Sequence, residues 1–281
     1  MRPRLLVVSA AILFSTAGAA IKSTTTMTAW QVAGLRSLIA AAALLAFLPE
    51  ARRHWSWRNW AVGLVYAVTL VLFVTANKLT TAANAIFLQA TAPLYILLAA
   101  PWLLREHIRR DDAPFMIAVG VGLAAFFVGV DAPVASAPNP PAGNLAAVAS
   151  GVTYALTVMG LRAVARSHPH ASLNTVVSGN LLAAAVCLPV GWPIARAQPF
   201  EWAILIWLGV FQIGLAYVFL SRGMRHVTAL EASLLLLAEP VLNPVWAWLA
   251  HGERPGRWAL AGGVLIVAAT TVRAVRAPSR P

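Results

Sequence analysis

The sequence predicts an all-α integral membrane protein with ten transmembrane helices, arranged as two inverted five-helix repeats with both termini cytoplasmic. Three observations lead to this fold class: an apolar composition, regularly spaced basic residues and an internal repeat. The chain has 281 residues, of which 60% are hydrophobic and 11% charged, whereas soluble domains are usually about a quarter charged. Its mean hydropathy is +0.75. These values exclude an ordinary soluble globule and a disordered chain.

Apolar runs of about 20 residues, the length that crosses a hydrocarbon core of about 30 Å, define the expected spans. The interruptions between them are short and carry turn residues or charge. The longest linker runs from Asp131 to Asn144, contains four prolines and divides the chain into repeats 1–135 and 136–281. The expected spans are 4–21, 29–48, 60–77, 82–104, 114–131, 143–161, 172–190, 202–221, 228–250 and 256–273.

The basic residues fix the expected orientation, because cytoplasmic loops are enriched in Lys and Arg. With the N-terminus inside, Arg36 lies within span 2 and fifteen of the 21 basic residues fall on the cytoplasmic side. Only five fall outside, which are Lys22, Lys78, Arg196, Arg254 and Arg257. This scatter between spans also argues against a nucleic-acid-binding surface, despite the formal net charge of +12. Tryptophans near the span ends are expected to anchor the bundle at the lipid interfaces, as Trp102 and Trp192 illustrate.

An internal repeat relates the two halves. A shift of 147 residues places Pro93 on Pro240 and Glu106 on Glu253, with thirteen positions between proline and glutamate in both halves. A shift of 140 aligns spans 1 and 6. The first span also has the features of a cleaved signal peptide, but its counterpart in span 6 favours its retention.

Repeats of five spans enter the membrane in opposite senses, an architecture common in secondary transporters. Pro93 and Pro240 each lie about halfway along their predicted helices. A proline there removes a backbone hydrogen bond and kinks the helix. We interpret both as hinge candidates. A packing kink without substrate contact is the alternative.

The repeated stretch from Leu79 through Pro93 to Glu106, and from Val227 through Glu239-Pro240 to Gly252-Glu253, resembles the EamA-type branch of the drug/metabolite transporter superfamily. Arg36 and the pairs Phe14-Ser15 and Tyr154-Ala155 are also similar. The sequence departs from the family pattern at Arg105, before Glu106, and at Phe115. The resemblance implies a ten-helix carrier, commonly an exporter of amino acids or other small metabolites, and makes Tyr154 a candidate site residue.

Ionisable side chains at membrane depth are costly and usually face the bundle interior or an aqueous cavity. Arg36 lies about seven residues into span 2, and Glu239 lies halfway along span 9. Both fall in the outer-to-middle zone. We interpret Arg36 as an anchor for a substrate carboxylate and Glu239 as an amine-binding or coupling group. A structural ion pair between them, or a snorkelling Arg36, is the alternative.

Helical spacing adds further candidates. Asn84, Thr91 and Tyr95 share one face of span 4, and Asn243 and Trp246 share a face of span 9 with Glu239. Hydrogen bonding between helices is the alternative role for each of them. Less firmly placed polar groups are Asn180, Gln89, Gln212 and Tyr217.

Enzymatic functions find no support in the sequence. Phosphate-loop, zinc-protease and nucleophile-elbow motifs do not occur, and the single cysteine, Cys187, excludes cysteine-based metal sites. We therefore expect that the protein is not an enzyme and has no cofactor or metal. We expect a multi-pass protein that lies in the lipid bilayer of the cytoplasmic membrane and carries a small zwitterion across it. Multidrug and nucleotide-sugar carriers, a channel and a non-transporting scaffold or receptor are the alternatives. The choice between monomer and homodimer stays open.

The predicted topology is testable by cysteine labelling in a Cys187→Ala background. Cysteines at Arg109 and Arg166 should resist impermeant thiol reagents in intact cells, because both positions are predicted to be cytoplasmic. Cysteines at Ala135 and Arg196 should react, because both are predicted to lie outside. Labelling of the first pair would contradict the ten-span topology.

Overall fold

The structure is a computed structural model that describes residues 3–53, 55–103, 112–128, 132–165, 171–194, 197–224, 227, 232 and 235–276. Within these residues the chain is helical apart from loops and one isolated bridge between Val134 and Ala137. The first half contains α1 (Pro3–Ser15), α2 (Ala17–Lys22), α3 (Ala29–Phe47), η1 (Pro49–Arg52), α4 (Trp57–Leu79), α5 (Ala82–Gln89), α6 (Ala92–Leu103) and α7 (Ala113–Val128). The second contains α8 (Pro140–Ala165), α9 (Ala171–Gly191), α10 (Pro199–Ile206), η3 (Trp207–Leu215), α11 (Ala216–Gly223), α13 (Ala238–His251) and α14 (Arg257–Arg276).

The all-helical fold class is confirmed, and each predicted span coincides with described helix. Eight helical segments of the described chain are long and apolar enough to cross a membrane. The other two predicted spans, 114–131 and 228–250, correspond to α7 and α13, which are shorter in the described chain. Ten spans, the repeat arrangement and the orientation of the termini therefore stay predictions.

Several predicted spans are broken in the structure. Span 1 divides into α1 and α2 at Thr16, and span 4 divides into α5 and α6. Span 8 is continuous but contains the π-helical stretch η3 between α10 and α11. Helix α8 begins at Pro140, inside the predicted linker. The fixed backbone angle and missing N–H of proline suit the first turn of a helix, which explains this earlier start.

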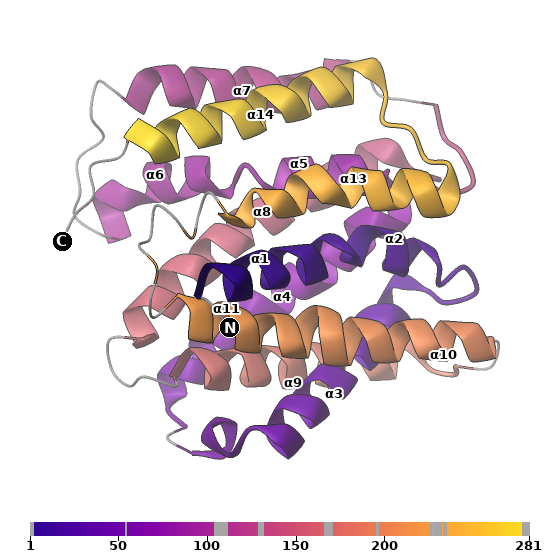
Figure 1. Ribbon diagram of the computed structural model, residues 1–281. Helices are drawn as coiled ribbons and strands as arrows, with labels where there is room; N and C mark the ends of the chain where they lie inside the picture. The colour runs from indigo at the N-terminus through magenta and orange to yellow at the C-terminus, as the bar shows by residue number, and fades with distance from the viewer. Residues whose placement is uncertain are drawn as a thin grey trace.

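Figure 1 shows helices that run mostly along one common direction. Helices α7 and α14 lie side by side at the top, and α3 and α9 lie at the bottom, with the remaining helices between them. The beginning of α1 and the end of α14 lie at the same end of the bundle. The opposite end, at the right of Figure 1, is where α2 and α13 finish and α10 begins. We refer to it as the Lys22 end.

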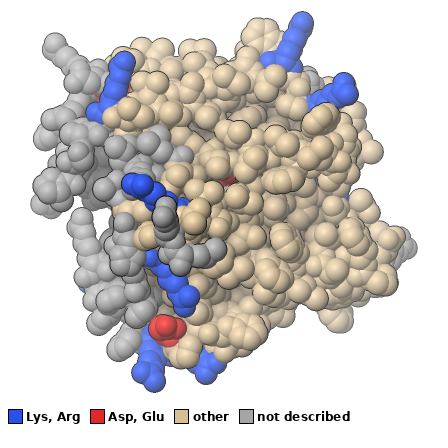
Figure 2. Space-filling model, in the orientation of Figure 1, with Lys and Arg blue, Asp and Glu red and all other residues tan. Residues whose placement is uncertain are grey.

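Basic side chains lie toward the edges of the visible face. Figure 2 shows Lys and Arg along the left side and at the upper right, with a broad area without basic side chains between them. Large tryptophans are exposed near helix ends, and Trp102 is 82% exposed. Such a surface suits an apolar band in lipid with basic and aromatic residues at its borders.

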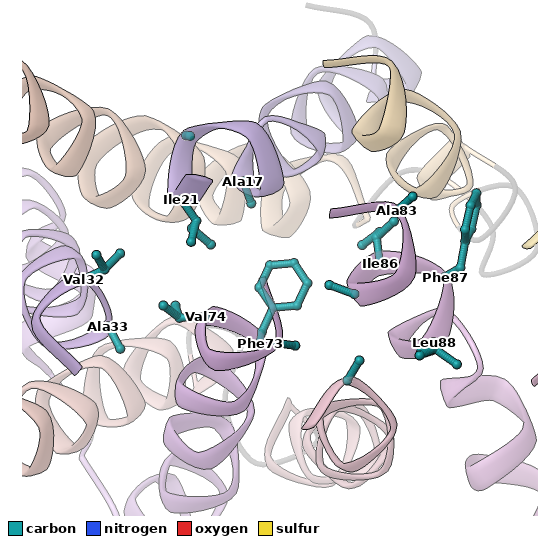
Figure 3. Close-up of a cluster of buried hydrophobic side chains, with 14 of the residues drawn as sticks. Ala17, Ile21, Val32, Ala33, Phe73, Val74, Ala83, Ile86, Phe87 and Leu88 are labelled. Carbon is teal, nitrogen blue, oxygen red and sulfur yellow. The ribbon is translucent and has the colours of Figure 1, made fainter. Parts of the chain in front are cut away.

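The main core joins the helices of the first half to residues of α8, α9, α10, η3 and α14. Figure 3 shows Phe73 of α4 between Ile21 of α2, Val32 of α3 and Ile86 of α5. These side chains are all buried. A second buried cluster, which includes Ala41, Tyr66 and Val177, joins α3, α4 and α9.

Helices α7 and α14 approach closely because both have glycine at the contact. A Cβ atom added at Gly122 would lie 2.9 Å from the carbonyl oxygen of Gly262 and 2.8 Å from Ile266. A Cβ added at Gly262 would lie 2.5 Å from the carbonyl oxygen of Gly122. Small residues allow this backbone approach, which is how helices associate in lipid, where the hydrophobic effect does not drive them together.

This contact makes Gly122→Ala destabilising, although alanine is the better helix former. The added methyl must push α14 away, and overpacking of this kind costs about 1–3 kcal/mol. Gly120→Ala is the matched control, because nothing lies within 4 Å of its added Cβ. Thermal unfolding in detergent should show a lower Tm for Gly122→Ala and an equal or higher Tm for Gly120→Ala. Equal values for both variants would contradict the proposed role of the glycine contact.

Candidate functional site

The two predicted hinge prolines lie directly after helix breaks at equivalent positions. Ala90 separates α5 from α6, and Leu237 precedes α13. Ala90 and Leu237 are 147 residues apart, the same shift that relates Pro93 to Pro240. Both prolines lie in the first turn of a new helix, where their missing N–H costs no hydrogen bond. The structure thus has a break before each proline, in place of the kink that the sequence predicts.

Helix α8 covers the break between α5 and α6. A Cβ added at Gly151 would lie 3.0 Å from the carbonyl oxygen of Leu88 and 3.2 Å from the ring of Tyr95. The Gln89 side chain donates a hydrogen bond of 2.7 Å to the hydroxyl of Ser150. Thr91 is buried, and its hydroxyl donates to the carbonyl oxygen of Leu88 at 2.5 Å. The irregular backbone is therefore held against protein, as membrane depth requires.

Glu239 lies at the second break, beside an aromatic cluster. The rings of Tyr66 and Tyr217 are 5.8 Å apart between centroids, and those of Phe14 and Tyr217 are 5.1 Å apart. Tyr154 and Tyr217 both lie within electrostatic range of the Glu239 carboxylate. Glu239 is half-buried, so the residue retains some accessible surface. Among the described residues, no hydrogen bond or ion pair satisfies this carboxylate.

Arg36 lies near the same tyrosines. Its side chain donates to the carbonyl oxygen of Leu70 at 3.2 Å, and the residue is 1% exposed. Tyr66, Tyr217 and Cys187 lie within its electrostatic range. Its Nε is buried without a hydrogen-bond partner. Within the described chain Arg36 forms no ion pair with Glu239, and Tyr217 lies within electrostatic range of both charges.

Asn180 extends this cluster from α9. It is fully buried, and its amide nitrogen donates to the carbonyl oxygen of Val176 at 2.8 Å. Its side-chain oxygen has no hydrogen-bond partner. A group that donates a hydrogen bond to this oxygen would break none of the existing hydrogen bonds. Gln212 also has an unpartnered buried side-chain oxygen.

The remaining predicted site residues have other surroundings. Asn84 joins Thr80 and Asn144 near the Lys22 end, with its amide 3.1 Å from the Asn144 side-chain oxygen. The hydroxyl of Tyr95 is buried without a partner. The indole of Trp246 donates to the hydroxyl of Ser15 at 2.9 Å.

Asn243 is fully buried between neighbouring helices. Its amide atoms would lie 2.5 Å and 3.1 Å from a Cβ added at Gly18, and neither atom has a hydrogen-bond partner. Both lie against α2, so Asn243 faces a helix contact. The predicted polar stripes on α5–α6 and α13 are thus divided between the aromatic cluster and helix contacts.

Tyr66 is a residue for which the sequence gives no signal. It lies in the middle of α4, and no charged residue or repeated position lies beside it. Tyr217 is predicted only as one of the less firmly placed polar groups. Their pairing depends on how α4 and α11 face each other, which the sequence pattern does not determine.

Comparison with known proteins defines the class to which this bundle belongs. The family model for the EamA-like transporter family matches residues 1–128 and 141–273. The protein belongs to this family and is a multi-pass transporter of the cytoplasmic membrane. A solved structure, described only as a crystal structure of a protein, superposes with a TM-score of 0.66 at 23% identity and covers 99% of this chain and 98% of its own. It supports the fold alone.

Curated relatives agree with this class. The pseudopaline exporter CntI of Pseudomonas aeruginosa strain UCBPP-PA14 is 28% identical over 273 residues, with 94% of this chain and 93% of the relative covered. The corresponding protein of strain PAO1 has the same identity and coverage. An uncharacterized transporter of Archaeoglobus fulgidus is 25% identical over 205 residues, covering 73% of this chain and 72% of its own.

Proposed function

We propose that the protein exports amino acids or similar small zwitterionic metabolites by alternating access, as two inverted five-helix repeats with their site at the helix breaks. The observation that carries this proposal is the position of Tyr217, which packs against Tyr66 and lies within electrostatic range of both Arg36 and Glu239. A zwitterion presents one cationic and one anionic group, which match the two separate charges. Aromatic faces beside Glu239 add cation–π attraction for the ammonium group.

Arg36 and Glu239 serve different roles in this proposal. Glu239 retains accessible surface and receives the substrate amine. Arg36 is covered in this conformation and binds the substrate carboxylate once α4 and α11 separate. Its unpartnered Nε supports this role, because a buried donor without a partner is costly unless a ligand satisfies it.

Export as the direction rests on the relatives. The Pseudomonas aeruginosa proteins are named exporters of pseudopaline. Their similarity over nearly the whole chain favours the same direction here. Identity of 28% does not transfer the cargo itself.

Two other substrate classes are the alternatives for a carrier of this fold. A polyanion such as a nucleotide sugar needs several basic groups for its phosphates, and Arg36 is the basic residue beside the aromatic cluster within the described chain. A hydrophobic cation suits Glu239 and the tyrosines but leaves Arg36 without a role. The zwitterion uses both charges.

A metabolite panel in proteoliposomes tests the substrate class. Wild-type protein should exchange amino acids or related zwitterions and should show little exchange of nucleotide sugars. Arg36→Gln should weaken apparent affinity for zwitterions about tenfold or more, because a charged hydrogen bond is lost. Exchange of amines without a carboxylate should be less affected by this variant. Preferential transport of nucleotide sugars would contradict the proposal, and lack of any transport would favour a scaffold.

Coupling of transport to protons is expected from the carboxylate of Glu239. Glu239 can hold either a proton or the ammonium group of a substrate. If its surroundings differ between the two facing states, proton binding and substrate binding become linked. The breaks before Pro93 and Pro240 supply flexible points about which the bundle can rock between these states.

Glu239→Gln tests this coupling, because it keeps the side-chain shape but cannot ionise. The variant should lose accumulation driven by a pH gradient and retain measurable downhill exchange. Glu239→Asp is the matched variant, and it should recover part of the gradient-driven accumulation because it still ionises. Gradient-driven accumulation by Glu239→Gln would show that coupling lies elsewhere.

A further inference from the structure

The most heavily charged buried cluster of the described chain lies outside the candidate site, at the Lys22 end. Lys22 closes α2, and Glu253 follows α13. Their Nζ and Oε1 atoms are 3.2 Å apart, and the two side chains are only 3% and 4% exposed. Removing two charges from water is expensive, so a pair this dry requires further partners.

Those partners come from the corner between α4 and α5 and from the segment before α8. Lys22 donates to the carbonyl oxygen of Thr80 at 2.9 Å and also to that of Ser136. The second carboxylate oxygen of Glu253 accepts a 3.0 Å hydrogen bond from the backbone N–H of Ala82. Ala82 is the first residue of α5, where the helix dipole favours a negative charge. The ion pair therefore ties α2 and the end of α13 to the beginning of α5.

The helices joined here are those that extend from the two breaks. Helix α5 runs from Ala82 to the break at Ala90, and α13 runs from the break at Leu237 to His251. Glu253 connects their far ends. Gly18 of α2 allows close contact with both helices, because an added Cβ would lie 2.8 Å from Ala82 and 2.5 Å from Asn243. Movement of α5 away from α13 about the breaks must separate these groups.

We propose that Lys22, Glu253 and the first amide of α5 form a latch that holds the Lys22 end closed and is broken when this end opens. This inference rests on the proposed alternating-access function. In the closed state each charge is satisfied by its partner. In the open state water solvates both charges, which offsets the loss of the pair. The latch thus has two low-energy arrangements with few between them, as a switching element requires.

A second carboxylate at the same end ties another connection. Glu201 of α10 accepts hydrogen bonds from the backbone N–H of Thr26 at 2.7 Å and from the N–H of Gln198 at 3.0 Å. Lys78 donates to the carbonyl oxygen of Thr24. These contacts hold the loop between α2 and α3. The Glu201 and Lys78 contacts do not involve α5 or α13. The latch therefore consists of the Lys22–Glu253 pair and its contact with α5.

Thiol labelling reports whether this end opens. A cysteine at Ala83, which is 2% exposed and adjacent to Ala82, serves as the reporter in a Cys187→Ala background. A cysteine at Ala183 in α9, 1% exposed and part of the second core cluster, serves as the control. The probe is N-ethylmaleimide, applied to purified protein in liposomes without substrate or a pH gradient. Failure of proton coupling at Glu239 therefore does not affect this readout.

Glu253→Gln keeps the hydrogen-bond acceptor for Ala82 but leaves the Lys22 charge buried and unpaired. It should accelerate labelling at position 83 at least about tenfold, because an unpaired buried charge is strongly unfavourable. Lys22→Met combined with Glu253→Gln removes both charges and should return labelling toward the wild-type rate. This non-additivity is the signature of a paired interaction. Labelling at position 183 should be unchanged in all variants.

Gly18→Ala provides an independent test that keeps both charges. Its methyl group displaces Asn243 and Ala82 and should also accelerate labelling at position 83 but not at position 183. The proposal is overturned if Glu253→Gln and Gly18→Ala both label at the wild-type rate. Equal acceleration at positions 83 and 183 would also overturn it, because this indicates general loosening of the fold. A double variant as fast as Glu253→Gln would show that the two charges do not act as a pair.

Discussion

A helical bundle in lipid must satisfy its polar groups from within, because hydrocarbon offers no hydrogen bonds. This constraint accounts for the distribution of charge in the structure. Lys22 and Glu253 are buried together, and their remaining atoms contact backbone groups of neighbouring helices. Arg36 contacts the carbonyl oxygen of Leu70. Glu239 differs, since its carboxylate has no such partner in the described chain and keeps accessible surface, which is why it is the better candidate for ligand binding.

The same constraint explains why the helix breaks are covered. At Ala90 the interrupted backbone packs on Gly151 of α8, and the hydroxyl of Thr91 satisfies one carbonyl group. Breaks in this position give a membrane protein points of bending without exposed backbone. Helix α5 precedes the first break and α13 follows the second, and their far ends meet at the Lys22–Glu253 pair. The proposed site and the proposed latch are therefore connected through two short helices.

The sequence predicts much of this architecture but not how its helices face one another. Hydropathy locates the apolar segments, and the repeated Pro93 and Pro240 indicate where the chain is interrupted. However, the prolines lie in the first turns of new helices, because the chain is already interrupted before each of them. No residue type in the sequence indicates these interruptions. The pairing of Tyr66 with Tyr217 depends on the rotation of α4 and α11. The expected spans place Lys22 and Glu253 in loops, and only the tertiary fold brings the two side chains into contact.

The central claim is that Glu239 holds either a proton or the substrate amine. Proton release upon substrate binding measures this directly, with purified protein in weakly buffered detergent solution and the best-exchanged zwitterion of the metabolite panel. Wild-type protein should release protons as substrate is added, in proportion to the sites filled, and Glu239→Gln should bind without release. Equal proton release from both proteins, or none from wild type at saturating substrate across the pH range in which transport occurs, would contradict the account.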